Sequence, residues 1–252
     1  MHLLVFIIGL VIGSFLNVCI YRIPKKQSIC YPSSHCIKCN IKIKWYDNIP
    51  LISYAILQGK CRYCKENIDL QYPIVEILNG ILYLILFYHY KFTISFIFHG
   101  LIASILLVVF FIDFQEMIIP DILVVTIIVL EIFHKFILYF TTSAKVNLLD
   151  SVIGLLVAGM IFMFIILFSK GQMGSGDMTL ISALGFILGL KYILLTIFLS
   201  FFIGAILSLL LLLFGVKSRK DFIPFSPFII LGFFIVLLYG ESIINLYIEL
   251  II

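Results

Sequence analysis

Long apolar runs separated by short polar segments dominate the pattern of this chain. The runs lie at about 3–21, 73–90, 93–112, 119–140, 149–169, 177–190, 192–214 and 224–250. Because they are continuous rather than alternating, they predict membrane-spanning helices and not barrel strands. The run at 177–190 is short, as in a tilted or re-entrant segment. The pattern therefore predicts an all-α integral membrane protein with about eight transmembrane helices.

Composition excludes a soluble fold. The chain has 252 residues, of which 63% are hydrophobic and 12% are charged, whereas about 25% of the residues in a soluble domain are charged. No Lys or Arg precedes the first run and no A-x-A-like site follows it, so we expect residues 3–21 to be a retained helix and not a signal peptide. The lipid bilayer is the first expected partner.

Positive charge predicts the orientation of the chain in the membrane. Nine of the 17 Lys and Arg residues lie between Arg22 and Lys65. Together with the turns at 113–120, 170–176 and 215–223, which fall on the same side of an eight-helix topology, this segment carries 13 of the 17. Positive loops mark the cytoplasmic side. The basic segment is thus a topology signal, and we expect no nucleic-acid partner.

Two cysteine pairs lie in this basic loop. Cys36-x-x-Cys39 and Cys61-x-x-Cys64 have the spacing with which two turns supply four thiolates to one metal ion. Two disulfides or four unrelated thiols are the alternatives. The reducing cytosol disfavours disulfides, so we expect a structural zinc ion that stabilises a loop with little core of its own.

Two aspartates stand where apolar runs meet polar turns. Asp113 ends the run at 93–112, where the helix dipole disfavours an anion, so helix capping does not explain it. Asp177 follows Gly171, Gly174 and Gly176 and has a local alternative as a helix N-cap. Asp121, after Pro120, is interpreted as such a helix start.

The predicted topology places Asp113 and Asp177 on the same side of the membrane. Two carboxyl groups that share a proton can activate a water molecule, one as base and one as acid. A proton or ion pathway also uses intramembrane carboxylates. The spacing of the residues leaves both chemistries open.

Several motifs together carry a resemblance that extends over nearly the whole chain. They are GSFLNVCIYRIP (13–24), WYDNIPLISY (45–54), YPIVEILNG (72–80), Asp113 followed by five residues and Ile-Pro-Asp, GSGD (174–177) and IPFSPF (223–228). With them the chain resembles the type IV prepilin peptidases, G-x-G-D membrane aspartyl proteases that trim the leader from pilin-like subunits.

The resemblance implies roles for the residues above. It makes Asp113 and Asp177 the catalytic pair and makes Cys36, Cys39, Cys61 and Cys64 the zinc ligands. It implies prepilin or pseudopilin substrates, whose leaders are basic and end in Gly, and a multi-pass location in the bacterial inner membrane. It also implies three parts: a first helix (1–22), a cytoplasmic zinc loop (23–72) and a seven-helix protease domain (73–252).

In many members a second activity N-methylates the new N-terminus with S-adenosylmethionine. No Rossmann-type glycine motif in this sequence supports a methyl-donor site, so the residues leave that activity and its binding residues open. One position departs from the family pattern: Thr179 stands where many relatives have Lys.

Two other functions remain as alternatives. One is another G-x-G-D protease, such as a preflagellin or signal-peptide peptidase, against which the four cysteines argue. The other is a proton-coupled transporter. The sequence leaves open whether the substrate serves pili, secretion or DNA uptake, and it leaves the oligomeric state open.

Overall fold

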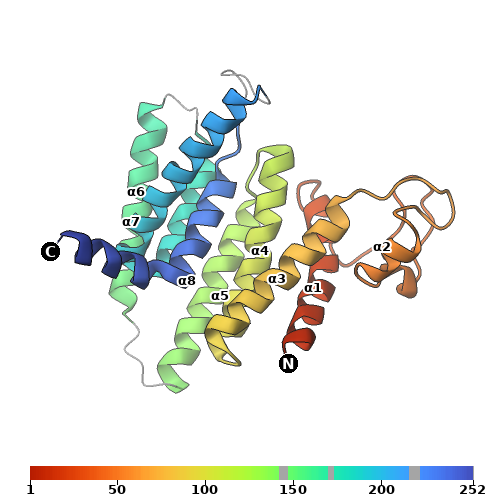
Figure 1. Ribbon diagram of the computed structural model, residues 1–252, viewed down its shortest axis with the longest axis horizontal. Coiled ribbons are helices and arrows are strands. Elements are labelled where there is room, and N and C mark those ends of the chain that lie inside the picture. Colours follow the sequence, from red (N-terminus) through yellow and green to blue (C-terminus); the bar gives the residue numbers. More distant parts are fainter. Residues whose placement is uncertain (142–146, 170–172, 216–221, 252) are drawn as a thin grey trace. The chain divides into compact units, whose positions relative to one another are not determined.

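The computed structural model describes residues 1–141, 147–169, 173–215 and 222–251. Within these ranges the chain is helical with no strand, and seven helices are long and apolar enough to cross a membrane. They are α1 (His2–Arg22), α3 (Gln71–Tyr90), α4 (Ile94–Glu116), α5 (Asp121–Thr141), α6 (Leu148–Phe168), α7 (Ser175–Leu213) and α8 (Ser226–Ile251) (Figure 1). The prediction of an all-α multi-pass membrane protein is confirmed.

Some residues used in the sequence analysis lie outside the described ranges. They are Gly171 and the basic residues of the turns at 170–176 and 215–223, namely Lys170, Lys217, Arg219 and Lys220.

Helix α7 is a reversal of the chain rather than one straight rod. Its 39 residues are interrupted at Gly189, where φ is 76° and ψ is 177°. Gly154 of α6 approaches the backbone of Gly185 and Gly189, whereas Phe162, two turns further along α6, contacts Phe201 at a ring-centroid distance of 6.0 Å. The two halves of α7 therefore run in opposite directions. They account for the two separate runs expected at 177–190 and 192–214.

The chain divides into two compact units, Met1–Ile112 and Asp113–Ile252. In the first unit, α1 and α3 pack antiparallel through small residues. A Cβ atom added at Gly9 or Gly13 would lie 2.8 Å from the Cα atom of Gly80 or Glu76. Such glycines let helix backbones approach closely inside a membrane.

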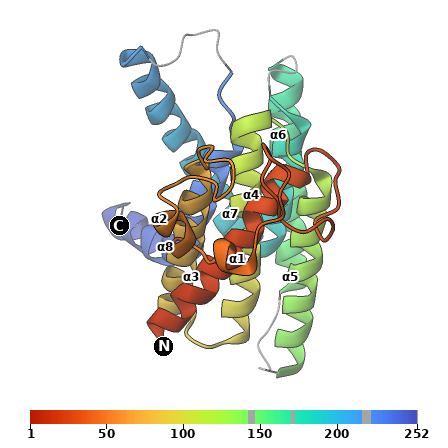
Figure 2. The same cartoon turned by 90° about the vertical axis from the view of Figure 1, so that its right-hand side faces the viewer.

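The segment between α1 and α3 carries the four cysteines. It contains a short 3-10 helix η1 (Trp45–Asn48) and the short helix α2 (Ile52–Ile56). Figure 2 shows this segment in front of α1.

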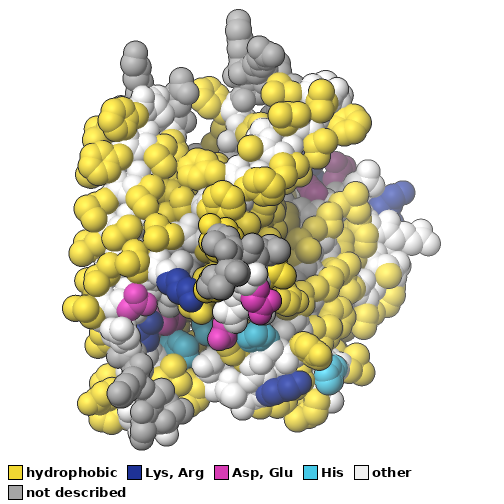
Figure 3. Space-filling view, turned by 60° about the vertical axis from the view of Figure 1, so that its left-hand side comes forward, with side chains coloured by type: hydrophobic (Ala, Val, Ile, Leu, Met, Phe, Trp, Pro, Cys, Tyr) yellow, Lys and Arg dark blue, Asp and Glu magenta, His cyan; other side chains and the backbone are white. Residues whose placement is uncertain are grey.

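In the second unit, α6 and α8 pack on the two halves of α7. A Cβ atom at Gly185 would overlap the carbonyl oxygen of Gly154, and one at Gly232 would lie 2.7 Å from Ser200 Oγ. Apolar side chains such as Phe198 and Phe202 are exposed on α7. Hydrophobic side chains cover most of the face in Figure 3, which suits contact with lipid.

The reversal at Gly189 gives the first prediction. A Cβ atom there would overlap the carboxylate of Asp150, which accepts a hydrogen bond from the Leu190 N–H at 3.2 Å. Gly215 has a similar φ of 67° but open space around it. Gly189→Ala strains the backbone by about 1–3 kcal/mol, because a positive φ with ψ near 180° is essentially restricted to glycine, and it also adds a steric clash. Gly215→Ala adds no clash. We expect Gly189→Ala to lower the unfolding temperature in detergent by several degrees more than Gly215→Ala. Equal shifts would contradict the tight turn.

Candidate active site and metal centre

Asp113 lies in the last turn of α4, and its side chain is 6% exposed. Its Oδ2 atom accepts hydrogen bonds from Ser226 Oγ at 2.7 Å and from the Ser226 N–H at 3.3 Å. Ser226 is fully buried and is the first residue of α8. The positive end of the α8 dipole and two donors thus face a carboxylate that the end of α4 would disfavour.

Asp177 lies in the first turn of α7 and is 8% exposed. The N-cap of α7 is Gly174, and no side chain caps the helix, so the interpretation of Asp177 as an N-cap is wrong. One carboxylate oxygen, Oδ2, lies near Gly174. The other, Oδ1, is buried and accepts no hydrogen bond from the residues that the structure describes. A buried oxygen without a donor is costly and is available to bind water or substrate.

A close contact joins the turns that carry the two aspartates. A Cβ atom at Gly176 would lie 2.9 Å from Ile119 Cβ, so glycine lets the α4–α5 turn pack against the start of α7. The structure thus brings both predicted carboxylates to the same end of the second unit, whereas Glu116 and Asp121 are exposed.

Thr179 occupies the position that departs from the family pattern. Its Oγ1 donates a hydrogen bond to the carbonyl oxygen of Gly176 at 2.9 Å. This hydrogen bond lies within the first turns of α7, and the neutral hydroxyl adds no charge near the aspartates.

Ser226 is the site residue that the sequence analysis missed. A signal was present, because Ser226 and Pro227 open the last apolar run, and Pro is common in the first turn of a helix. A helix that begins at Ser226 places the Ser226 hydroxyl, and the free N–H groups of the first helical turn, on the same side of the membrane as Asp113. Its pairing with Asp113, 113 residues away in sequence, has no local signal.

The two cysteine pairs form matching turns. In the first, the Cys36 N–H donates to the Ile41 carbonyl at 3.0 Å, and in the second the Cys61 N–H donates to the Glu66 carbonyl at 2.8 Å. An isolated antiparallel bridge flanks each turn, His35 with Lys42 and Lys60 with Asn67. The backbone thus holds both pairs in the same conformation.

The four sulfur atoms of Cys36, Cys39, Cys61 and Cys64 lie within 4.8 Å of one another. The Cys36 and Cys64 sulfurs are 3.8 Å apart. Four thiolates around one zinc ion at about 2.3 Å would lie ~3.8 Å apart. All four cysteines are free thiols, and Cys19 and Cys30 lie outside the cluster. The cluster could bind a metal, and its geometry fits zinc.

Electrostatics also prepare the cluster for a cation. The backbone N–H groups of Cys64 and Tyr63 lower the pKa of the Cys61 thiol to about 7. At Cys64 the Glu66 N–H acts in the same direction, but desolvation and hydrogen bonds with the other thiols raise the pKa to about 11. Backbone N–H groups thus stabilise thiolate at Cys61, the form in which cysteine binds a metal ion.

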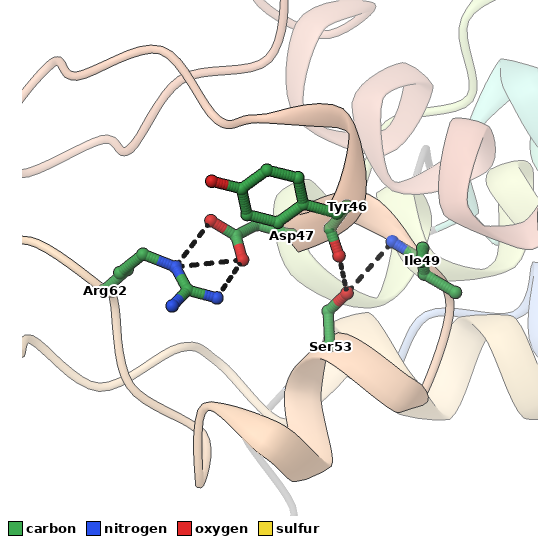
Figure 4. Close-up of polar contacts among 5 residues, drawn as sticks. All are labelled: Tyr46, Asp47, Ile49, Ser53 and Arg62. Atoms are coloured by element: carbon green, nitrogen blue, oxygen red, sulfur yellow. Dashed lines mark hydrogen bonds and ion pairs between the residues drawn. The ribbon is translucent and has the colours of Figure 1, made fainter.

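An ion pair anchors the second cysteine turn to η1. Arg62, between the two cysteines, binds Asp47 with Nη2–Oδ1 and Nε–Oδ2 distances of 2.6 and 2.9 Å (Figure 4). The Arg62 hydrogen bonds hold the pKa of Asp47 below its usual range. Ser53 Oγ, which donates to the Tyr46 carbonyl at 2.8 Å and accepts from the Ile49 N–H at 3.0 Å, joins η1 to α2. The cysteine loop is therefore an ordered structure.

Comparison with known proteins assigns both parts of the chain. Residues 7–90 match the Bacterial Peptidase A24 N-terminal domain, and residues 100–209 match the Type IV leader peptidase family. No solved structure matches the chain significantly.

Similar curated proteins cover nearly the whole chain. A prepilin leader peptidase/N-methyltransferase from Legionella pneumophila is 33% identical over 98% of this chain and 94% of its own length. Proteins of the same name from Vibrio cholerae and Bacillus subtilis are 36% and 31% identical, over 91% and 98% of this chain and 93% and 98% of their own lengths. With this similarity added to the two aspartates and the four cysteines, the chain belongs to the type IV leader peptidase family.

Proposed function

We propose that this protein is a membrane aspartyl endopeptidase that removes the basic leader of prepilins or pseudopilins at the cytoplasmic face of the membrane. Asp113 and Asp177 are its catalytic pair. One observation carries the assignment: two buried carboxyl groups lie in the second unit, one hydrogen-bonded to Ser226 and the other with an oxygen that accepts no hydrogen bond from a described residue.

The hydrogen bonds of Ser226 give the two aspartates different roles. Donors stabilise a carboxylate anion, so Asp113 is the ionised base and Asp177 carries the shared proton. Asp113 takes a proton from a water molecule as the water oxygen attacks the scissile carbonyl carbon. Asp177 donates its own proton to the carbonyl oxygen. When the tetrahedral gem-diol collapses, the C–N bond breaks, the leaving amine takes the proton held by Asp113, and Asp177 takes back a proton from a gem-diol hydroxyl as the new carbonyl forms.

The location of the pair suits a substrate that is partly in the membrane. Asp113 and Asp177 lie at the ends of apolar helices, next to the exposed turn that contains Glu116. A basic leader can remain in water at this boundary while the apolar helix behind the cleavage site stays in lipid.

A zinc ion bound by Cys36, Cys39, Cys61 and Cys64 is the proposed structural metal. Four protein ligands leave no open position for water, so this zinc takes no part in peptide hydrolysis. Its role is to fold the loop between α1 and α3.

N-methylation of the new N-terminus is the proposed second activity, because the similar curated proteins carry N-methyltransferase in their names. S-adenosylmethionine supplies an electrophilic methyl group in such a reaction. The substrate amine attacks as a neutral group, so the protein must accept its proton and keep both reactants in place.

The catalytic pair is tested by Asp113→Asn and Asp177→Asn. Asn keeps the size of the side chain but cannot exchange a proton, and general acid–base catalysis contributes about 10²–10⁴-fold to rate. We expect each change to lower leader cleavage of a co-expressed prepilin by at least about 10²-fold, with insertion intact. Asp121→Asn is the matched control and should cleave normally, since Asn serves as well as Asp at a helix start. Cleavage at the wild-type rate by Asp177→Asn would exclude the pair.

Ser226 is tested by Ser226→Ala and Ser226→Thr. A hydrogen bond to a charged group contributes about 1.5–3 kcal/mol, which corresponds to a loss of about 10–100-fold in kcat for Ser226→Ala. Because the anion loses a donor, the acidic limb of the pH–rate profile should move to higher pH. Ser226→Thr keeps the hydroxyl and should recover most of the rate. A lower rate with an unchanged pH profile would contradict the positioning of Asp113.

Metal analysis of the purified protein tests the zinc proposal. We expect about one zinc ion per chain, since four thiolates complete one tetrahedral site. The double change Cys36→Ser and Cys39→Ser should remove the metal and make the loop sensitive to protease. Cys30→Ser, at an exposed thiol outside the cluster, is the control that should keep it. Full metal content in the double variant would reject the site.

A further inference from the structure

The loop between α1 and α3 exposes large apolar side chains on its two short helices. Trp45 of η1 is 81% exposed, and Ile52 and Ile56 of α2 are 57% and 71% exposed. The two isoleucines are four residues apart, so they lie on one face of α2. Ser53 and Tyr54 instead line a cavity between the loop and the two membrane helices. Trp45, Ile52 and Ile56 are referred to below as the apolar surface of the loop.

A hydrogen bond holds α2 at the level of the membrane boundary. The Leu51 N–H, one residue before α2, donates to Glu76 Oε2 at 2.9 Å. Glu76 is the sixth residue of α3, which begins at Gln71, and at 1.5 Å per residue it lies ~8 Å inside the end of that helix. The headgroup region on each side of a bilayer is about 5–8 Å thick. The start of α2 therefore lies at headgroup depth, and Figures 1 and 2 show α2 beside α1 rather than beyond its end.

The same loop carries an excess of positive charge. Residues 23–70 contain eight Lys and Arg against three Asp and Glu. Two of the basic residues form ion pairs, Arg62 with Asp47 and Lys38 with Glu66. The other six are exposed lysines that form no ion pair with any residue in the described part of the chain. They are Lys25, Lys26, Lys42, Lys44, Lys60 and Lys65.

Two of these lysines flank the short helices that carry the apolar surface. Lys44 directly precedes Trp45 and is the N-cap residue of η1. Lys60 follows α2 by four residues, and its N–H donates to the Leu57 carbonyl at 3.0 Å. Tryptophan and lysine suit the boundary between lipid and water, because their apolar parts contact acyl chains while their polar ends stay among the headgroups. Apolar and basic side chains at this depth therefore fit a layer of anionic lipid headgroups.

Other occupants fit this surface less well. The basic leader of a prepilin is repelled by the excess of positive charge on the loop. A second copy of the loop carries charge of the same sign, and like charges brought together across an interface are unfavourable. An acidic soluble protein could pair with the lysines, but it would have to reach headgroup depth to cover Ile52 and Ile56. Lipid is already present at that depth.

We propose that the cysteine loop docks on the anionic phospholipids of the membrane. Trp45, Ile52 and Ile56 enter the boundary between headgroups and acyl chains, and Lys44 and Lys60 bind headgroup phosphates. Each lysine near an anionic surface favours docking by about fivefold, and this contribution falls as salt screens the charges. The docking surface uses neither the aspartate pair nor the four clustered cysteines, so the inference does not depend on the proposed cleavage or methylation.

Trp45 is the single tryptophan of the chain, so its fluorescence reports on this surface alone. The full-length protein is reconstituted into phosphatidylcholine vesicles that contain increasing phosphatidylglycerol and lipids brominated near the headgroup. We expect bromine to quench Trp45, more strongly as phosphatidylglycerol rises and less strongly in high salt. The double change Lys44→Gln and Lys60→Gln should raise the phosphatidylglycerol fraction at half-maximal quenching by at least about twofold. The double change Lys91→Gln and Lys191→Gln, at exposed lysines outside the loop, is the matched control and should behave as the wild type does.

Each outcome decides for or against lipid docking. Quenching of Trp45 by acrylamide from the water but not by brominated lipid would leave the loop in the cytosol and overturn the proposal. Protection from both quenchers would show that protein covers the surface, which also overturns it. Quenching by lipid that ignores phosphatidylglycerol, salt and the loop lysines would remove the role of anionic headgroups. If the loop variant changes its metal content, the dependence of wild-type quenching on phosphatidylglycerol decides alone.

Discussion

The cost of burying the Asp113 carboxylate is the constraint on which the second unit depends. An isolated charge in an apolar layer is unfavourable by several kcal/mol, and the end of α4 adds an unfavourable dipole. The start of α8 offsets both effects through the hydroxyl and the N–H of Ser226. The end of α4 and the start of α8, which are far apart in sequence, must therefore meet at this point.

Sequence patterns predicted the helical membrane fold because apolar length alone identifies spanning segments. They also singled out both aspartates, which end or begin apolar runs, and all four cysteines, which recur in C-x-x-C pairs; the roles of these residues stay predictions. The reversal at Gly189 was harder to predict from the sequence, because its positive φ depends on packing against Asp150. The short apolar run at 177–190 indicated an irregular segment but not the turn. The bond from Ser226 to Asp113 arises from a tertiary contact that no local pattern records.

The two units accommodate their polar groups near lipid in different ways. In the second, buried carboxyl groups are placed at helix ends, where free backbone N–H groups are available. In the first, a loop with little apolar core is ordered by matching cysteine turns and by the Arg62–Asp47 pair. Family membership favours the peptidase over the proton-coupled transporter, and these arrangements show which groups each part can offer to a substrate.

The reversal at Gly189 also has a consequence for the surrounding lipid. From Ser175 to Gly189 the first half of α7 is only ~21 Å long at 1.5 Å per residue, whereas the hydrocarbon core of a bilayer is about 30 Å thick. A short segment is matched by thinning the bilayer around it, at a modest cost for each ångström of mismatch. Lipids with shorter acyl chains would thus relieve the mismatch at the helix that carries Asp177. The thickness of the membrane therefore affects the helix that carries Asp177.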